Sequence, residues 1–172
     1  MKFKVLFSAQ EPPKSQVPFT GYITNNGNPE FEDEKYQVAL MFEDLSEVMY
    51  DYKNNQIVNV NQHPIKIRKQ LDIDTAFFKE CVCKKYIIPE MSFYFFSLLP
   101  GDSYPINDFT VILKDVKVLQ SKIVLPDLTS EQNLHKPVIE DILLLSSEVT
   151  WKYERNSDSM VGSKVFIFKQ DS

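Results

Sequence analysis

The last third of the chain, from Phe109 to Phe168, consists of strand patterns that follow one another with almost no helix signal. Residues 109–119 (FTVILKDVKVL) are rich in β-branched side chains, and 137–155 (PVIEDILLLSSEVTWKYER) form a pattern longer than the roughly five or six residues of an average strand. A turn-forming stretch at 156–159 then leads into a partner strand, 162–168 (GSKVFIF). A long hairpin of this kind belongs to a β-barrel or sandwich, and it argues against a doubly wound, nucleotide-dependent enzyme.

Alternation along the long pattern predicts which of its side chains face the core. Apolar side chains occupy most odd-numbered positions, and charged or polar ones lie between them. The predicted apolar face holds Leu143, Leu145, Val149, Trp151 and Tyr153, and the opposite face holds Glu148, Thr150, Lys152 and Glu154. Trp151 and Tyr153 are therefore expected to be core residues and not a ligand-stacking pair.

Other elements follow from similar patterns. An apolar stripe through Ile73, Phe77, Phe78 and Cys81 predicts one helix, which begins after Asp72 or Asp74 and packs against the aromatic strand 91–98. Residues 120–137 are expected to be a long connection with a helical turn at 129–134. Further strands are predicted at 2–8, 19–24, 35–42, 48–52, 56–60, 65–68 and 86–99. The fold class predicted is mainly β, with two packed antiparallel sheets forming a β-barrel and one α-helix on its side.

Composition limits the size of the fold and its partners. The chain has 172 residues, of which 43% are hydrophobic and 13% aromatic, so we expect one domain, residues 1–172, with a core of its own. The net charge of -5 and the lack of a basic run argue against nucleic acid as a partner. No apolar stretch reaches the roughly 18 residues of a membrane span, so no membrane insertion is expected.

No catalytic, cofactor or metal site is predicted. His63 and His135 are the only histidines, and neither lies in a recognisable nucleophile motif. The acidic cluster at 30–34 lacks the spacing of a calcium loop. Cys81 and Cys83 at i and i+2 of a helix point about 200° apart, so they neither bridge nor share a metal. We expect them to be ordinary buried or half-buried thiols.

Three segments resemble the haemolysin-coregulated proteins (Hcp), the hexameric tube subunits of bacterial type VI secretion systems. The first is Lys69-x-Leu71-Asp72 with Thr75 and the helix that carries Cys81 and Cys83, preceded by His63. The second is the strand FTVILKDVKVLQS, in which Leu113, Asp115, Val116, Val118 and Ser121 fill the pattern. The third is the closing hairpin, 138–168. The chain departs from the family in having only four glycines, so it resembles a divergent member or a phage tail-tube relative.

The resemblance implies a structural, non-enzymatic protein. It implies a ring-forming, hexameric subunit of a type VI secretion or phage-tail-like inner tube, whose partners are stacked rings, sheath and spike components and effector cargo. Assembly in the cytoplasm would precede export without a cleaved signal peptide, because residues 1–13 (MKFKVLFSAQEPP) lack a long apolar region. The expected ring-stacking loop is Asn54, Asn55, Gln56, Ile57, Val58 and Asn59.

Two other classes of protein fit the predicted fold. A monomeric β-barrel ligand carrier or inhibitor would have a sealed cavity and would form no ring. An enzyme of unknown type is the third class, and the sequence offers it no motif. In the loop region from Asp51 to Gln62, only Ile57, Val58 and Val60 are expected to be available for burial. The contact between stacked rings is therefore expected to be weak and mainly polar.

Overall fold

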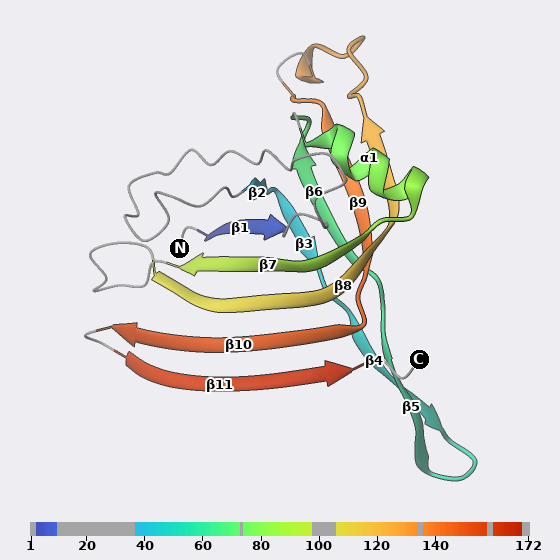
Figure 1. The fold of residues 1–172 in the computed structure, drawn as a ribbon, viewed down its shortest axis with the longest axis vertical. Helices are drawn as coiled ribbons and strands as arrows, with labels where there is room; N and C mark the ends of the chain where they lie inside the picture. Colours follow the sequence, from blue (N-terminus) through green and yellow to red (C-terminus); the bar gives the residue numbers. More distant parts are fainter. Residues whose placement is uncertain are drawn as a thin grey trace.

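A computed structural model describes residues 3–9, 37–72, 74–97, 106–133, 136–157 and 160–169. The predicted strand 19–24, the acidic cluster 30–34, Ile73 and His135 lie outside these residues. The described part is built almost wholly of antiparallel strands, with one α-helix, α1 (Thr75–Lys84), and one 3₁₀ turn, η2 (Glu131–Asn133) (Figure 1).

The strands form one large sheet and a separate two-stranded hairpin. The sheet has the order β2-β1-β7-β8-β9-β6-β3, and β10 and β11 branch from β8. Its strands are β1 (Phe3–Ala9), β2 (Gln37–Ala39), β3 (Met41–Glu43), β6 (Ile65–Gln70), β7 (Ile87–Ser97), β8 (Ile106–Val124), β9 (Ile139–Leu145), β10 (Glu148–Ser157) and β11 (Met160–Lys169). The hairpin consists of β4 (Ser46–Asp51) and β5 (Gln56–Gln62).

The sheet curls on itself because both ends of its path belong to one stretch of chain. β2 pairs with β1 and β3 pairs with β6, and only Leu40 separates β2 from β3. The backbone N–H of Leu40 donates to the carbonyl of Arg68 at 2.7 Å. The predicted mainly β barrel with one helix on its side is confirmed, and its two packed layers are parts of one curled sheet.

A corner crosses the three central strands and produces much of this curl. On β8 the buried positions change from odd (Val111, Leu113) to even (Val116, Val118) around Asp115, whose φ is 50°. On β7 the same change falls between Ile88 and Met91. Pro89 lies at that step, where it has no N–H to contribute to the ladder.

The third segment at this corner, residues 137–155, corrects one prediction. The long pattern 137–155 divides into β9 and β10 at Ser146 and Ser147, and the buried side chains of β9 are even-numbered, including Ile142 and Leu144. Leu143 and Leu145 therefore do not share the buried face of Val149, as alternation had predicted. Ser147 holds the junction between β9 and β10 against β8. Its N–H donates to the carbonyl of Lys114 at 3.0 Å, and its hydroxyl donates to Asp115 at 2.8 Å.

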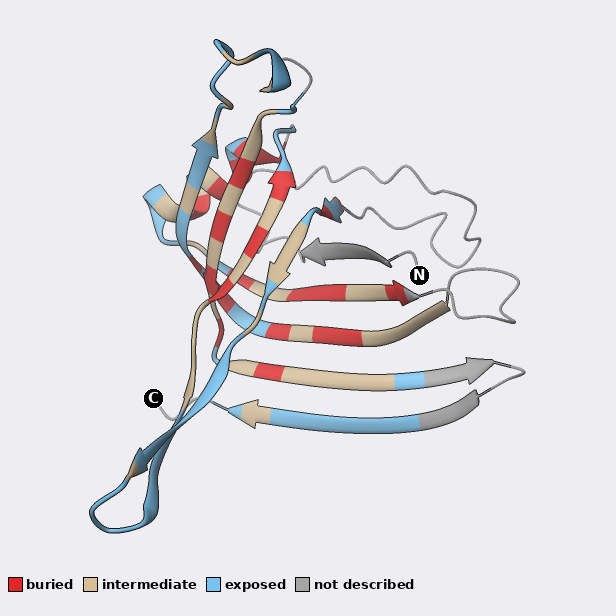
Figure 2. Ribbon diagram, turned by 180° about the vertical axis from the view of Figure 1, so that it is seen from behind, coloured by how far each residue is buried: buried red, intermediate tan, exposed pale blue. Residues whose placement is uncertain are grey.

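The core lies inside the curl and under α1 (Figure 2). Its centre holds side chains with 0% exposure, among them Ile67, Phe78, Phe93 and Leu113. The predicted stripe of Phe77, Phe78 and Cys81 is buried, and it shares one core with Met91 and Phe93 of the aromatic strand, while the backbone of β8 also approaches the helix. Phe42 of β3 reaches the ring of Phe93 at 4.8 Å, so the strand that closes the barrel also fills it.

Candidate functional site

The β4–β5 hairpin, which we call the arm, projects from the barrel at one end of the molecule (Figures 1 and 2). Its ladder runs from Ser46 and Gln62 to Asp51 and Gln56, with a bulge between Met49 and Tyr50. Asp51 organises the turn, because its carboxylate accepts from the N–H of Lys53 at 2.8 Å and from the side chain of Asn54 at 2.7 Å. These bonds hold the pKa of Asp51 below its usual value.

The arm is more ordered and more apolar than the sequence predicted. The predicted stacking residues divide between the turn (Asn54, Asn55) and β5 (Gln56, Ile57, Val58, Asn59), and all six are exposed. Their partner strand adds further exposed apolar side chains, so the view that only three apolar residues are available was wrong. The exposed apolar set is Val48, Met49, Tyr50, Tyr52, Ile57, Val58 and Val60.

Such a surface is typical of a contact with another molecule. A two-stranded hairpin is only marginally stable in water by itself, and contiguous exposed apolar side chains mark contact surfaces in soluble proteins. Tyr52 is 88% exposed at the tip and Ile57 is 63% exposed beside it. The arm therefore has the properties of a docking element.

The root of the arm is fixed by a small polar cluster. Asp44, which follows β3, accepts from the side-chain amide of Gln62 at 2.5 Å and from the indole N–H of Trp151 at 2.7 Å. The N–H of His63 donates to the carbonyl of Leu45 at 2.9 Å, and its ring contacts Glu47 at 2.7 Å. His63 thus belongs to the arm's root.

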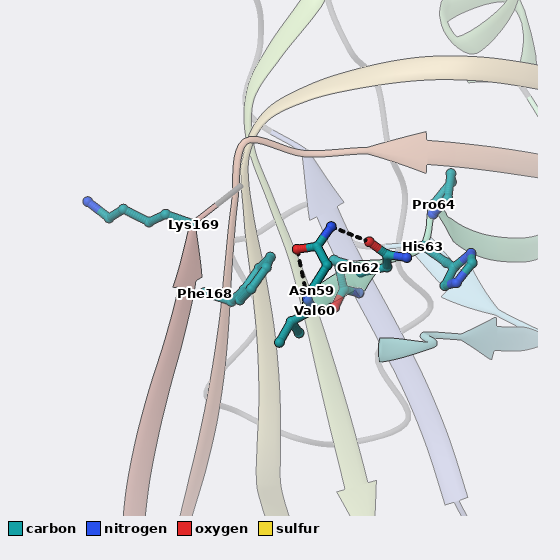
Figure 3. A pocket seen from close by; sticks show the side chains of 8 residues that line it. Asn59, Val60, Gln62, His63, Pro64, Phe168 and Lys169 are labelled. Atoms are coloured by element: carbon teal, nitrogen blue, oxygen red, sulfur yellow. Dashed lines mark hydrogen bonds between the residues drawn. The ribbon is translucent and has the colours of Figure 1, made fainter. Parts of the chain in front are cut away.

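An open cleft lies beside this root, between β5 and the end of β11 (Figure 3). Its volume is about 640 Å³. The ring of Phe168 faces Asn59 and Val60 across it, whereas Lys169 points away (Figure 3). The full lining is Asn59, Val60, Asn61, Gln62, His63, Pro64, Phe168 and Lys169. It is a shallow, amide-rich space, and it lies outside the barrel.

A second candidate contact surface is the free edge of β11. Within the described residues β11 pairs with β10 alone, so its other edge offers unpaired N–H and C=O groups along most of ten residues. Val165, Phe166 and Ile167 are 52%, 59% and 52% exposed. A long edge with exposed apolar side chains is a template for pairing with another strand, so this edge is a second candidate contact surface.

Charged groups within the barrel join strands and form no reactive centre. Lys69, 1% exposed, places its ammonium 2.5 Å from Asp72 and 3.3 Å from Glu140, which is 0% exposed. Glu140 also accepts from the hydroxyl of Ser121 at 2.5 Å. This cluster ties β6, β8 and β9 to the start of α1. It explains physically why Lys69 and Asp72 occur together at this point of the sequence.

Three further ion pairs, in two groups, join neighbouring strands. Arg68 of β6 and Asp141 of β9 form a two-point bond at 2.6 and 2.9 Å, which lowers the pKa of Asp141 and raises that of Arg68. On β10, Glu148 lies 2.7 Å from Lys114 and 3.1 Å from Lys169, and the hydrogen bonds from these lysines lower its pKa. Both arrangements are structural.

The two thiols differ. Cys81 is buried, and burial raises its pKa to about 12, so it is a poor nucleophile. Cys83 is exposed, which corrects the expectation that it would be buried or half-buried. In the part of the chain that the structure describes, no three His, Cys, Asp or Glu side chains gather as a metal site, and no helix there is both long and apolar enough to cross a membrane.

The architecture falls in the class of curled antiparallel barrels with a projecting hairpin. Protein-family models give no match to the chain, and neither do curated protein sequences. Solved structures match along almost the whole chain. A crystal structure of an Hcp protein has a TM-score of 0.76 at 12% identity and covers 99% of this chain and 100% of its own.

Two more matches extend the comparison. An Hcp1 variant from the E. coli EAEC pathovar has a TM-score of 0.68 at 13% identity, with 97% of each chain covered. A type VI secretion system effector from Yersinia pestis has a TM-score of 0.67 at 10% identity, covering 96% of this chain and 99% of its own. The chain therefore has the Hcp fold, which confirms at the level of structure the resemblance found in the sequence.

Sequence reasoning missed the residues that hold these surfaces in place. Asp44 was noted only as an interruption between strands, and its partner Trp151 lies 107 residues further along the chain. Glu140 had no signal beyond its place in a strand pattern. A hint existed in each case, since Glu43-Asp44 and Glu140-Asp141 are acidic pairs between apolar residues, and a carboxylate that is buried there must find a partner.

Proposed function

We propose that this chain is a non-catalytic, ring-forming subunit of a type VI secretion or phage-tail-like inner tube. The observation that carries the proposal is the match of the whole chain, arm included, to Hcp structures: 99% of this chain on 100% of the other. The ring is taken to be a hexamer, as the family resemblance implies. Stacked rings, sheath and spike components and effector cargo would be its partners.

The two contact surfaces have distinct roles in this proposal. The free edge of β11 pairs with a neighbouring subunit, which removes an edge that would otherwise aggregate and closes a ring by heterologous contacts. The arm, at the end of the molecule, reaches the next ring in the stack. Its exposed Tyr52, Ile57 and Val58 supply apolar contact area that a purely polar loop would lack.

Export would follow assembly in the cytoplasm, without a cleaved signal peptide. The type VI effector among the structural neighbours fits such a route. A monomeric ligand carrier is disfavoured by the packing of the barrel, whose interior positions Phe93, Leu113 and Ile142 are 0% exposed.

Mass in solution tests the ring. Light scattering or native mass spectrometry should give six copies of the 20.1 kDa chain. A clean monomer at tens of micromolar, at low and moderate salt, would count strongly against the proposal.

Deletion of residues 54–59 tests the arm. The hexamer should survive, because these residues lie outside the barrel, but tube assembly and secretion should fail in a cell that carries the sheath components. The double substitution Ile57→Ser and Val58→Ser should act in the same direction. Val165→Ser on β11 is the matched control, since it should weaken the ring and leave the arm unchanged. A broken ring in the deletion variant, or unaffected secretion, would contradict the assignment.

A further inference from the structure

The arm and the free edge are connected through one carboxylate. Asp44 has two oxygens, and each accepts from a different part of the chain: Oδ1 from Gln62 at the end of β5, and Oδ2 from Trp151 on β10. Because Asp44 lies in the two-residue link between β3 and β4, it sits where the arm leaves the barrel. Its carboxylate is therefore bonded both to the arm's returning strand and to the sheet beside it.

Trp151 continues this connection to the edge strand. Its indole stacks on the ring of Phe166, with centroids 5.6 Å apart and planes inclined by 23°. Phe166 lies opposite Trp151 in the β10–β11 ladder and is 59% exposed on the strand whose outer edge is free. A contiguous path thus runs from the edge through Phe166, Trp151 and Asp44 to Gln62 in the arm.

Three further contacts at the root join parts of the arm to each other. Ser46 donates to Gln62, His63 contacts Glu47, and His63 bonds to Leu45. Each of these joins the first and second strands of the arm or their immediate flanks, so none fixes the angle between the arm and the sheet. Among the side-chain hydrogen bonds that the described residues make at the arm and its root, the bond from Trp151 to Asp44 reaches β10.

We propose that Asp44 is a positioning residue that fixes the direction of the arm relative to β10 and β11, and that it thereby couples pairing at the β11 edge to the placement of the arm. A neighbour that pairs with β11 restrains Phe166, and the restraint passes to Trp151, Asp44 and the arm. Coupling of this kind is reciprocal, so a docked arm also favours the paired edge. The coupling rests on the proposed function, whereas the positioning role concerns the isolated subunit.

Three variants and a control test the positioning role. Asp44→Ala removes both acceptors, Trp151→Phe removes the N–H donor and keeps a ring for Phe166, and Asp44→Asn keeps one acceptor oxygen. Glu47→Gln is the matched control, because Glu47 is also a carboxylate at the arm's root, but it contacts His63 within that root. Hydrogen exchange of the His63 amide and of the amides of β4 and β5 is the measurement.

Asp44→Ala and Trp151→Phe should each speed exchange at the root by about tenfold, as expected for the loss of a hydrogen bond to a charged acceptor. The exchange rate in Asp44→Asn should lie between the rates in these two variants and the rate in the wild type. The double variant should exchange no faster than Asp44→Ala alone, because that variant already lacks the bond that Trp151→Phe removes. Glu47→Gln should leave exchange near the sheet unchanged.

Fluorescence supplies a second readout in the same samples. Trp151 is the sole tryptophan of the sequence, so its emission should shift toward that of a solvated indole in Asp44→Ala and stay unchanged in Glu47→Gln. Unchanged exchange in Asp44→Ala, additive effects in the double variant, or equal loosening by Glu47→Gln would overturn the positioning role.

Hydrogen exchange measured while rings form then tests the coupling separately from the proposed function. In the wild type, exchange at the arm's root should slow as rings form with rising concentration, and in Trp151→Phe rings should form without that slowing. Equal slowing in both proteins would overturn the coupling. If no rings form at any concentration, the proposed function fails, while the exchange and fluorescence results still decide the role of Asp44 in the subunit.

Discussion

The barrel and the arm use the same strand patterns with opposite outcomes. In the barrel, Ile65 and Ile67 of β6 are 2% and 0% exposed, because α1 and the curled sheet cover them. In the arm, Val58 and Val60 of β5, only a few residues earlier, are 62% and 45% exposed. Apolar alternation therefore shows that a face needs cover, but it does not show whether the cover comes from the same chain.

This contrast has an energetic side. Burial contributes about 25 cal/mol for each Å² of apolar surface removed from water, and the barrel gains it on folding. Under the proposed function, the arm gains it only when a neighbouring ring covers its apolar side chains. The two regions should consequently respond very differently to the same kind of substitution.

The largest expected effect is the loss of a core ring under the helix. Phe78→Ala should lower the free energy of unfolding by roughly 3–5 kcal/mol, because Phe78 is 0% exposed and its removal leaves a cavity. Ile57→Ala on the arm should change it by less than about 0.5 kcal/mol, as for an exposed side chain. Urea unfolding of both variants checks the pair, and a similar loss in both would break the contrast between barrel and arm.

The next effect concerns the buried charges of the barrel. Lys69→Met should destabilise the protein by about 3 kcal/mol, since it leaves the fully buried Glu140 without its cation. Adding Glu140→Leu should recover much of the loss, because the pair would then be replaced by apolar side chains. Thermal unfolding compares the two variants, and a double variant worse than the single one would show that the ion pair itself is needed.

The smallest effect is a pH dependence carried by Asp141. The Arg68 bond lowers its pKa in the folded state, so it contributes stability that is fully present above the ordinary Asp value of about 3.9 and is lost as the pH falls through the lower, folded value. Asp141→Asn should cost about 1 kcal/mol at neutral pH and flatten this part of the acid profile. Unfolding midpoints measured from pH 7 to pH 2 check it, and an unchanged acid slope in the variant would count against the pair.

Much of the barrel could be predicted from the sequence because its signals are local. The helix, the aromatic strand β7 and the closing hairpin each have a pattern within a dozen residues or so. The corner has no such local pattern, because Leu143 and Leu144 are both apolar. Either the odd-numbered or the even-numbered side chains of β9 could therefore face the core. Only the positive φ of Asp115 on the paired strand decides between them, and it acts across the sheet.

The contact surfaces were predictable only in part. An Asn-rich turn with Asp51 indicates a loop, and the six residues predicted for stacking do lie in the arm. Its first strand, β4, was underestimated because Val48, Met49 and Tyr50 match a half-buried strand equally well. The bond between Asp44 and Trp151 depends on tertiary structure alone, so no local pattern could reveal it.

The central place of β8 has a consequence for the order of events during synthesis. β8 pairs with β7 on one side, and on the other with β10 along its first half and β9 along its second. While the ribosome adds residues one by one, at about 5–20 per second, β8 and β7 emerge as a ribbon whose long outer edge stays empty until residues 139–157 follow. For several seconds, therefore, this edge of the nascent chain is open to incorrect strand pairing. A chaperone would bind at this stage.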